Sequence, residues 1–142
     1  YLHLVGGQFA AHASRYPPGE RRGEMADYYV PHRVEITVPD HDITRGIEDF
    51  DLTTEQYWVL TDAYSEVLAT TTTATREWGA WHGPVTCPAV WTRRWGAGRV
   101  FVATPGATEV PLPAHRSPGV TSRWWSRPQG RSLRLAPSRV PT

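Results

Sequence analysis

The chain has 142 residues, 39% of them hydrophobic, and a formal net charge of +1. This length and composition fit one soluble globular domain that can bury a core, and the small net charge offers no general attraction for nucleic acid. A single cysteine, Cys87, excludes an internal disulfide and a zinc site built from several thiolates. No apolar run has the length of a membrane span, so we expect a cytoplasmic protein.

The first predicted elements alternate between apolar runs and polar connections. Residues 1–5 form an apolar run that the glycine pair Gly6-Gly7 ends. Residues 13–29 are polar and rich in Pro and Gly, which predicts a surface loop. Residues 33–38 then alternate apolar and polar side chains on a β-branched background, which predicts a half-buried strand ended by Pro39.

A turn follows this strand and presents ionisable side chains. The strand delivers His41 to the turn, and either Asp40 or Asp42 can cap it. Three apolar side chains are expected to hold the turn on the body of the domain: Ile43, Ile47 and Phe50.

The remaining strands are predicted from aromatic and β-branched runs, which lie at residues 56–60, 66–73, 89–95 and 98–104. The last two are separated by Gly96-Ala97, which predicts a tight hairpin. Residues 78–84 contain glycines and a proline and are expected to form a loop. Residues 107–142 hold six arginines and one acid, with Pro and Ser recurring and no periodicity, so we expect a domain at 1–106 and a disordered basic tail at 107–142.

Four of these stretches, in this order, resemble the second half of the ThuA-like (trehalose utilisation) family. They are residues 1–12 with Gly-Gly-x-Phe-x-x-His, residues 33–60 with Asp-His-x-Ile-Thr-x-Gly and then Glu-x-Tyr, residues 67–72, and residues 88–106 ending in Thr-Pro-Gly. The resemblance implies an α/β, flavodoxin-like three-layer sandwich of the class I glutamine amidotransferase-like superfamily. This chain would hold a truncated, β-rich C-terminal half of that fold.

The sequence departs from the family pattern in two places. The first parallel strands of the family's sheet and their helices have no counterpart, and half of the surface at the strand ends is therefore missing. The family also has a His after the glycine that matches Gly106, whereas this chain has Ala107. We hypothesise a shifted reading frame after Gly106. Another frame of the coding DNA should then encode Gly-His followed by an amphipathic helix, and a failure to find it would refute the hypothesis.

The expected site residues are His12, His41 and Glu55. In the family fold both histidines would lie near the carboxyl end of the sheet, where imidazoles can act as general acid and base or bind a divalent metal such as zinc. Either histidine can also be an ordinary surface residue. The aspartates beside His41 can orient its ring. Glu55 is read either as a general base or third metal ligand, or as the acid in the first turn of a short helix.

Aromatic residues supply the candidate substrate contacts. If residues 56–60 form a strand, Tyr57 and Trp58 point to opposite faces, one toward the core and one toward the site. Trp78, Trp81 and His82 lie in a glycine-containing loop and can form a platform on which a sugar ring stacks. The alternative is that these tryptophans fold back on the core. We name Tyr57, Trp81 and His82 as expected substrate-binding residues.

The remaining reactive and charged side chains are assigned structural roles. Cys87 precedes a proline and enters a strand, with no following helix and no nearby His-x-Glu pair, so we expect a small buried hydrophobe and not an amidotransferase nucleophile. Three aromatic side chains are expected to pack in the core and hairpin: Trp91, Trp95 and Phe101. Three arginines are expected to be solvated at strand edges: Arg93, Arg94 and Arg99.

The resemblance implies a protein of bacterial carbohydrate metabolism that handles trehalose, another disaccharide or a keto-sugar. Metal-assisted acid–base chemistry is the reaction class we expect of an intact enzyme, and a fragment lacking half of the site would be inactive. A non-catalytic carbohydrate-binding module using Trp78 and Trp81 is the first alternative. Nucleic-acid binding through the basic tail is the second and is less favoured. We expect no membrane partner and leave a homo-oligomer open.

Overall fold

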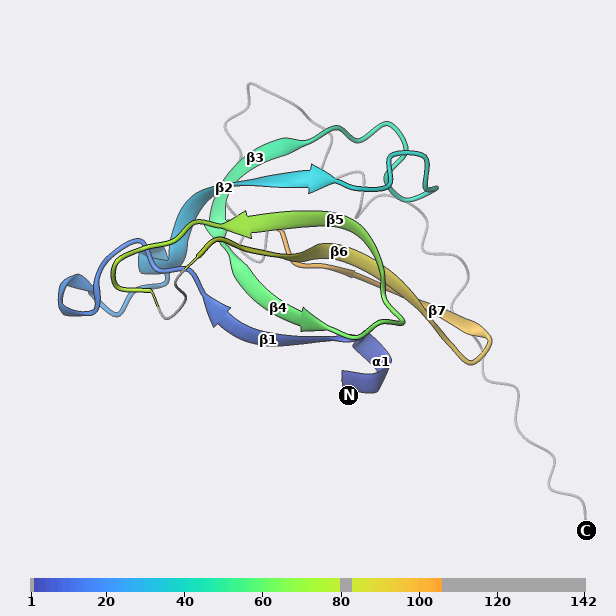
Figure 1. Ribbon diagram of the computed structural model, residues 1–142, viewed down its shortest axis with the longest axis horizontal. Helices are drawn as coiled ribbons and strands as arrows, with labels where there is room; N and C mark the ends of the chain where they lie inside the picture. The colour runs from blue at the N-terminus through green and yellow to red at the C-terminus, as the bar shows by residue number, and fades with distance from the viewer. Residues whose placement is uncertain (1, 80–82, 106–142) are drawn as a thin grey trace, which may run out of the picture.

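The computed structural model describes residues 2–79 and 83–105 (Figure 1). Its elements are α1 (Leu2–Val5), β1 (Gly7–His12), the 3-10 turns η1 (Pro18–Glu20) and η2 (Met25–Tyr28), β2 (Tyr29–Ile36), β3 (Phe50–Glu55), β4 (Tyr57–Thr61), β5 (Glu66–Thr73), β6 (Val85–Trp95) and β7 (Gly98–Ala103). No helix in this part of the chain is long and apolar enough to cross a membrane.

The strands form two antiparallel sheets. One has the order β3-β2-β5-β6-β7, and the other is the pair β1-β4. The β-rich character expected of the chain is therefore confirmed. Every strand pairing in residues 2–79 and 83–105 is antiparallel, whereas a flavodoxin-like sheet is parallel. These residues accordingly show a strand-rich domain and do not by themselves show the flavodoxin-like sandwich.

Most predicted strands are present, and two strands were missed. The strand at 66–73 is confirmed, as are the strand at 56–60 within one residue and the hairpin closed by Gly96-Ala97. The strand expected at 33–38 begins earlier, at Tyr29. Neither β1 nor β3 was predicted. The β1 sequence has no β-branched residue, and β1 forms because its backbone pairs with β4.

The loop at 13–29 is more ordered than its composition indicates. Asp27 is buried, and its Oδ2 accepts backbone N–H groups from Arg22, Gly23 and Glu24 at 2.8, 2.9 and 3.2 Å. The backbone N–H of Arg15 donates to the Asp27 carbonyl at 2.7 Å. One short acidic side chain thus organises the loop and holds η2 beside the start of β2.

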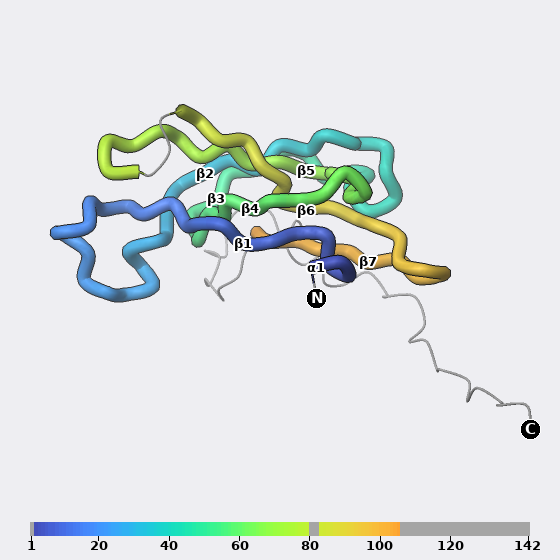
Figure 2. The backbone as a smooth tube through the Cα atoms, turned by 60° about the horizontal axis from the view of Figure 1, so that its bottom comes forward, coloured from blue at the N-terminus to red at the C-terminus, as the bar shows by residue number. Residues whose placement is uncertain are grey.

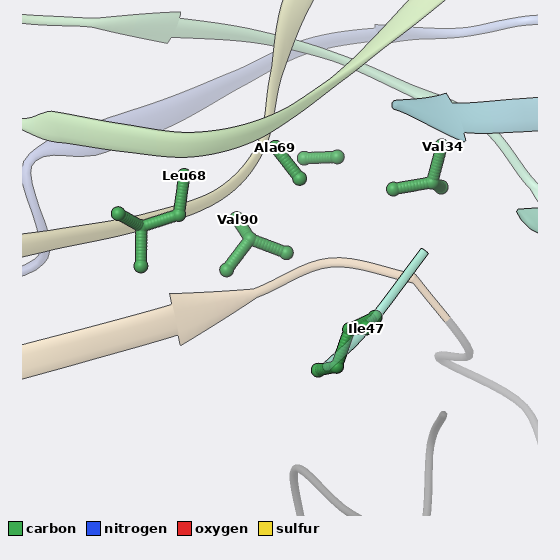
Figure 3. Close-up of a cluster of buried hydrophobic side chains, with 6 residues drawn as sticks. Val34, Ile47, Leu68, Ala69 and Val90 are labelled. Atoms are coloured by element: carbon green, nitrogen blue, oxygen red, sulfur yellow. The ribbon is translucent and has the colours of Figure 1, made fainter. Parts of the chain in front are cut away.

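The core is a cluster of buried hydrophobic side chains along the five-stranded sheet (Figure 3). Its buried members come from β2, β5, β6 and the turn after β2: Val34, Ile47, Leu68, Ala69, Ala89 and Val90. The prediction that Ile43, Ile47 and Phe50 hold this turn on the domain is confirmed, because Ile47 is in the cluster and the other two pack against it.

The β1-β4 pair packs against β6 through β4, which passes beside that strand in Figure 2. Trp91 on β6 is 2% exposed, and its Nε1 donates to the Val5 carbonyl at 2.7 Å. A Cβ on Gly7 would come within 2.5 Å of the Trp91 ring. The glycine pair is therefore a place where backbone passes directly over an aromatic ring.

Three side-chain predictions for β6 and β7 are wrong. Arg93 is 9% exposed and donates to Asp62 Oδ2 at 2.7 Å, so it is a buried ion-pair partner and not a solvated charge. Trp95 and Phe101 are 50% and 37% exposed. Phe101 points outward because β7 alternates strictly, with Val100 and Val102 on the inner face. Trp91 is buried as expected.

Candidate functional site

The structure brings together His12, Glu55 and Tyr57. His12 ends β1 and lies opposite Tyr57, the first residue of β4, in the antiparallel register. Glu55 ends β3, two residues before Tyr57. His12 Nε2 is 4.0 Å from Glu55 Oε1, and the Tyr57 hydroxyl donates to Glu55 Oε2. Residues 43 positions apart in sequence thus form one polar cluster, which we call the His-Glu-Tyr cluster.

Aromatic rings enclose the His12 imidazole on several sides. Phe9, Tyr28 and Tyr57 have ring centroids 4.7, 5.0 and 5.0 Å from that of His12, all in edge-to-face geometry. This packing fixes the ring orientation. His12 is 26% exposed at its side chain and Glu55 only 5%, so the imidazole is the member that solvent or a ligand reaches most readily.

The protonation state of Tyr57 follows from burial and hydrogen bonding. Burial raises the pKa of Tyr57 well above its usual value, and the hydrogen bond to Glu55 and the charge of that carboxylate raise it further. The phenol therefore remains a proton donor at neutral pH. Glu55 accepts from Tyr57 with one oxygen and turns the other toward His12. His12 is the residue suited to exchange a proton with a ligand, and Glu55 orients it.

An apolar groove of about 510 Å³ opens beside the cluster. Its walls come from α1, β1, β4, β6 and the end of β7: Val5, Gly7, Phe9, His12, Tyr57, Val59, Trp91, Val102, Ala103, Thr104 and Pro105. His12 and Tyr57 are its ionisable wall residues among those described. The apolar walls offer C–H and aromatic contacts to a ligand, and the cluster offers polar contacts at one place.

His41 lies at the other end of the sheet. Glu55 pairs with Tyr29 at the start of β2, whereas His41 follows the end of β2, about 20 Å away along an extended strand (Figure 1). There His41 Nε2 is 4.0 Å from Glu66, and the backbone N–H of Ile43 donates to His41 Nδ1 at 3.1 Å. The expected pairing of His12 with His41 is therefore not formed.

The hydrogen bond from Ile43 also bears on metal binding by His41. Because Nδ1 accepts an N–H, the neutral ring carries its proton on Nε2, the nitrogen that faces Glu66. A metal at Nε2 would require the opposite tautomer and the loss of this hydrogen bond. His41 thus serves the turn, where its ring caps the backbone in the way that an Asx side chain does.

The donors at the His-Glu-Tyr cluster do not fit a zinc ion by themselves. A catalytic zinc takes three protein ligands, and the cluster offers His12 and one oxygen of Glu55, since the other oxygen is engaged by Tyr57. Among residues 2–79 and 83–105, no three His, Cys, Asp or Glu side chains gather closely enough to hold a metal. We therefore derive no step through a metal.

The remaining predicted site residues separate into two groups. Trp81 and His82 lie outside the described residues. Trp78 is half-buried, and the guanidinium of Arg76 lies over its ring, 5.9 Å from the centroid. The reading of Glu55 as part of a short helix is wrong, because it is the last residue of β3. Cys87 is buried as expected, and burial raises the pKa of its thiol.

Sequence reasoning did not single out Phe9, Tyr28 or Gln56. Phe9 had a signal, since it stands three residues before His12 in the family element. Tyr28 had none, because it comes from a loop whose path depends on buried Asp27. Gln56 could have been noticed as the one residue between Glu55 and Tyr57.

Comparison with known proteins gives one match. A sequence model of the family described as "ThuA: Trehalose utilisation" matches residues 1–114. The match includes the whole His-Glu-Tyr cluster and every described wall residue of the groove. No curated protein and no solved structure matches the chain.

Proposed function

Because the chain belongs to the trehalose utilisation (ThuA) family, we propose that it acts in bacterial carbohydrate metabolism on a sugar derivative, namely trehalose, a related disaccharide or a keto-sugar. The observation that carries the proposal is the His-Glu-Tyr cluster in the wall of an apolar groove. Sugars present a face of C–H groups to aromatic rings and hydroxyl groups to polar side chains. The groove offers both kinds of contact.

The proposed chemistry is proton transfer by His12. Its imidazole accepts a proton from a sugar hydroxyl or from the carbon beside a keto group, and returns it later in the reaction. Glu55 holds the ring in position and stabilises the imidazolium that forms, and Tyr57 keeps Glu55 in place by donating to it. Phe9, which is 53% exposed, supplies the aromatic wall against which the sugar ring lies.

The proposal includes the fold of the complete protein. The family relationship supports a flavodoxin-like sandwich in which further βαβ units stand beside the strands described here. Coding DNA upstream of Tyr1 should then continue in frame for about a hundred residues in βαβ rhythm. An upstream sequence of another character would refute this part of the proposal.

Calorimetric titration of the protein with trehalose and with its keto derivative tests the function. His12→Asn and Phe9→Ala should each weaken binding by about tenfold, since each removes roughly 1 to 1.5 kcal/mol of contact. His3→Asn is the matched control, because His3 lies exposed on α1. Binding that survives both site variants but is lost in Trp81→Ala would instead support the carbohydrate-binding module.

A further inference from the structure

Gln56 stands where the chain crosses from one sheet to the other. The strand before it, β3, pairs with β2 in the five-stranded sheet, and the strand after it, β4, pairs with β1. The only residue between β3 and β4 is Gln56. Its chain neighbours are Glu55 and Tyr57, two members of the His-Glu-Tyr cluster. The position of this one residue therefore determines where both members lie.

The Gln56 side chain is hydrogen-bonded to β5 of the five-stranded sheet. Gln56 is 4% exposed, and its Nε2 donates to Thr71 Oγ1 at 2.8 Å and to the Thr72 carbonyl at 3.1 Å, both on β5. Thr71 Oγ1 donates in turn to the Arg33 carbonyl on β2 at 2.9 Å. The side-chain amide is thus built into a buried network that joins the crossing to two strands of the large sheet.

The Gln56 backbone reaches the third member of the cluster. Its carbonyl accepts the N–H of Ala13 at 3.1 Å, and Ala13 directly follows His12. One residue therefore restrains Glu55 and Tyr57 through the chain and His12 through a hydrogen bond. A shift of Gln56 would change the 4.0 Å separation between His12 Nε2 and Glu55 Oε1.

The chemistry at this position requires an amide. The pairing of β2 with β5 ends at Val34 and Thr71, so β2 leaves β5 before Thr72. Thr72 has no β2 residue opposite it, and its carbonyl accepts a hydrogen bond from the side-chain N–H of Gln56 instead. A carboxylate of the same shape cannot donate to that carbonyl, and an apolar side chain removes this hydrogen bond as well.

We propose that Gln56 is a positioning residue, whose buried amide clamps the crossing between the two sheets and thereby sets the geometry of His12, Glu55 and Tyr57. Gln56 is not itself one of the residues that line the groove. The inference rests on the proposed function only in taking this cluster as the site.

The test compares four variants of the full chain. Gln56→Leu and Gln56→Glu remove the donated hydrogen bonds while keeping similar volume or shape. Thr71→Val removes one acceptor and leaves the other, so its effect should be smaller. Leu68→Ala is the matched control, because Leu68 is fully buried on β5 but belongs to the separate core cluster. Circular dichroism establishes that each variant is folded where it is measured.

The readout is the ionisation of Tyr57, followed by ultraviolet difference absorbance against the same variant carrying Tyr57→Phe. The measurement is made at a pH about one unit above the usual tyrosine pKa, where Tyr57 should stay neutral in the wild type. In Gln56→Leu and Gln56→Glu it should be largely ionised at this pH, which requires a downward pKa shift of more than about two units, because solvent reaches the phenol and its bond to Glu55 loosens. Leu68→Ala should behave as the wild type.

Two results would overturn the inference. One is a Tyr57 that stays neutral in both Gln56 variants, and the other is equal ionisation in Leu68→Ala, which would indicate general loosening. If neither Gln56 variant folds, Thr71→Val decides. Partial ionisation of Tyr57 in Thr71→Val supports the clamp, and an unchanged neutral Tyr57 refutes it.

Sugar titration separates this inference from the proposed function. Failure of the wild type to bind any sugar, with Tyr57 ionised in Gln56→Leu, refutes the function and leaves the clamp standing.

Discussion

At the residue scale, both Glu55 oxygens face a neighbour in the His-Glu-Tyr cluster. Tyr57 occupies one oxygen, and the other faces His12. Glu55 is 5% exposed and has no place among the groove walls, so its role is to hold its two neighbours. The sequence assigned Glu55 a base or ligand role of its own. A buried carboxylate with two partners instead acts through them.

Replacing Tyr57 by phenylalanine should change both stability and its pH dependence. At neutral pH the buried Glu55 loses a donor, which should cost about 1 to 3 kcal/mol in the free energy of unfolding. Folding raises the pKa of Tyr57, so its contribution is complete below the unfolded pKa of about 10 and is lost as the pH rises above it. The wild type should therefore lose stability more steeply than Tyr57→Phe above about pH 10.

Denaturant unfolding across this alkaline range measures the difference. Tyr64→Phe is the control, because Tyr64 is 84% exposed, and this variant should follow the wild-type pH dependence. Identical slopes for Tyr57→Phe and the wild type would contradict the proposed protonation state of the cluster.

At the element scale, the contact between β1 and β6 depends on glycine. Gly7→Ala places a methyl group against the Trp91 ring, at 2.5 Å from the nearest ring carbon if nothing moves. The expected cost is about 1 to 3 kcal/mol in the free energy of unfolding. Gly19→Ala is the matched control, since its Cβ would meet no atom within 4 Å. Thermal unfolding of both variants measures the effect, and equal midpoints would show that β1 yields without cost.

An ion pair joins β6 to the residue that follows β4, and its arginine is more deeply buried than its aspartate. Arg93 is 7% exposed at its side chain and Asp62 is 43% exposed, with 2.7 Å between Arg93 Nη1 and Asp62 Oδ2. The same contact holds the pKa of Asp62 below its usual value. Arg93 is also surrounded closely, because a Cβ on Gly6 would strike its guanidinium.

This asymmetry predicts which substitution is worse. Asp62→Asn leaves a buried guanidinium without its counter-charge, whereas Arg93→Met removes the buried charge and fills much of the space. Asp62→Asn should therefore lower the free energy of unfolding more than Arg93→Met does, as measured by urea denaturation at neutral pH. The reverse order would mean that Arg93 acts chiefly through packing.

At the scale of the whole molecule, several side-chain contacts tie the small sheet and its flanking residues to the large one. Among them are the Gln56 amide on β5, the Trp91 indole on the Val5 carbonyl, the Cys87 thiol on the Tyr57 carbonyl, and the Arg93–Asp62 pair. Two strands alone are marginally stable in water. The β1-β4 pair should therefore unfold together with the five-stranded sheet.

Coincident transitions would confirm this coupling. Tryptophan fluorescence and far-ultraviolet circular dichroism should give one urea midpoint and one slope. Mutating a single tie, as in Gln56→Leu, should lower the midpoint while the two signals stay coincident. Two separate transitions in the wild type would show that the sheets unfold independently.

Much of the strand content was predictable because it depends on local periodicity. The β-branched run of β5 and the hairpin after Trp95 are readable within a dozen residues. The site was only partly predictable. The sequence predicted His12, Glu55 and Tyr57, but it also predicted His41. His41 and His12 are the same residue type in similar loop contexts, so the sequence alone could not distinguish them.

The sequence by itself determined the family, the β-rich class, the burial of Cys87 and the anchoring of the turn at residues 40–47, since each follows from residue type or short-range pattern. Only the tertiary structure decided that His12 meets Glu55 while His41 caps its own turn, that Arg93 is buried, and that Gln56 joins the sheets. Those outcomes depend on the register and crossing of strands far apart in the chain, and side chains that meet across sheets leave no periodic signal in sequence.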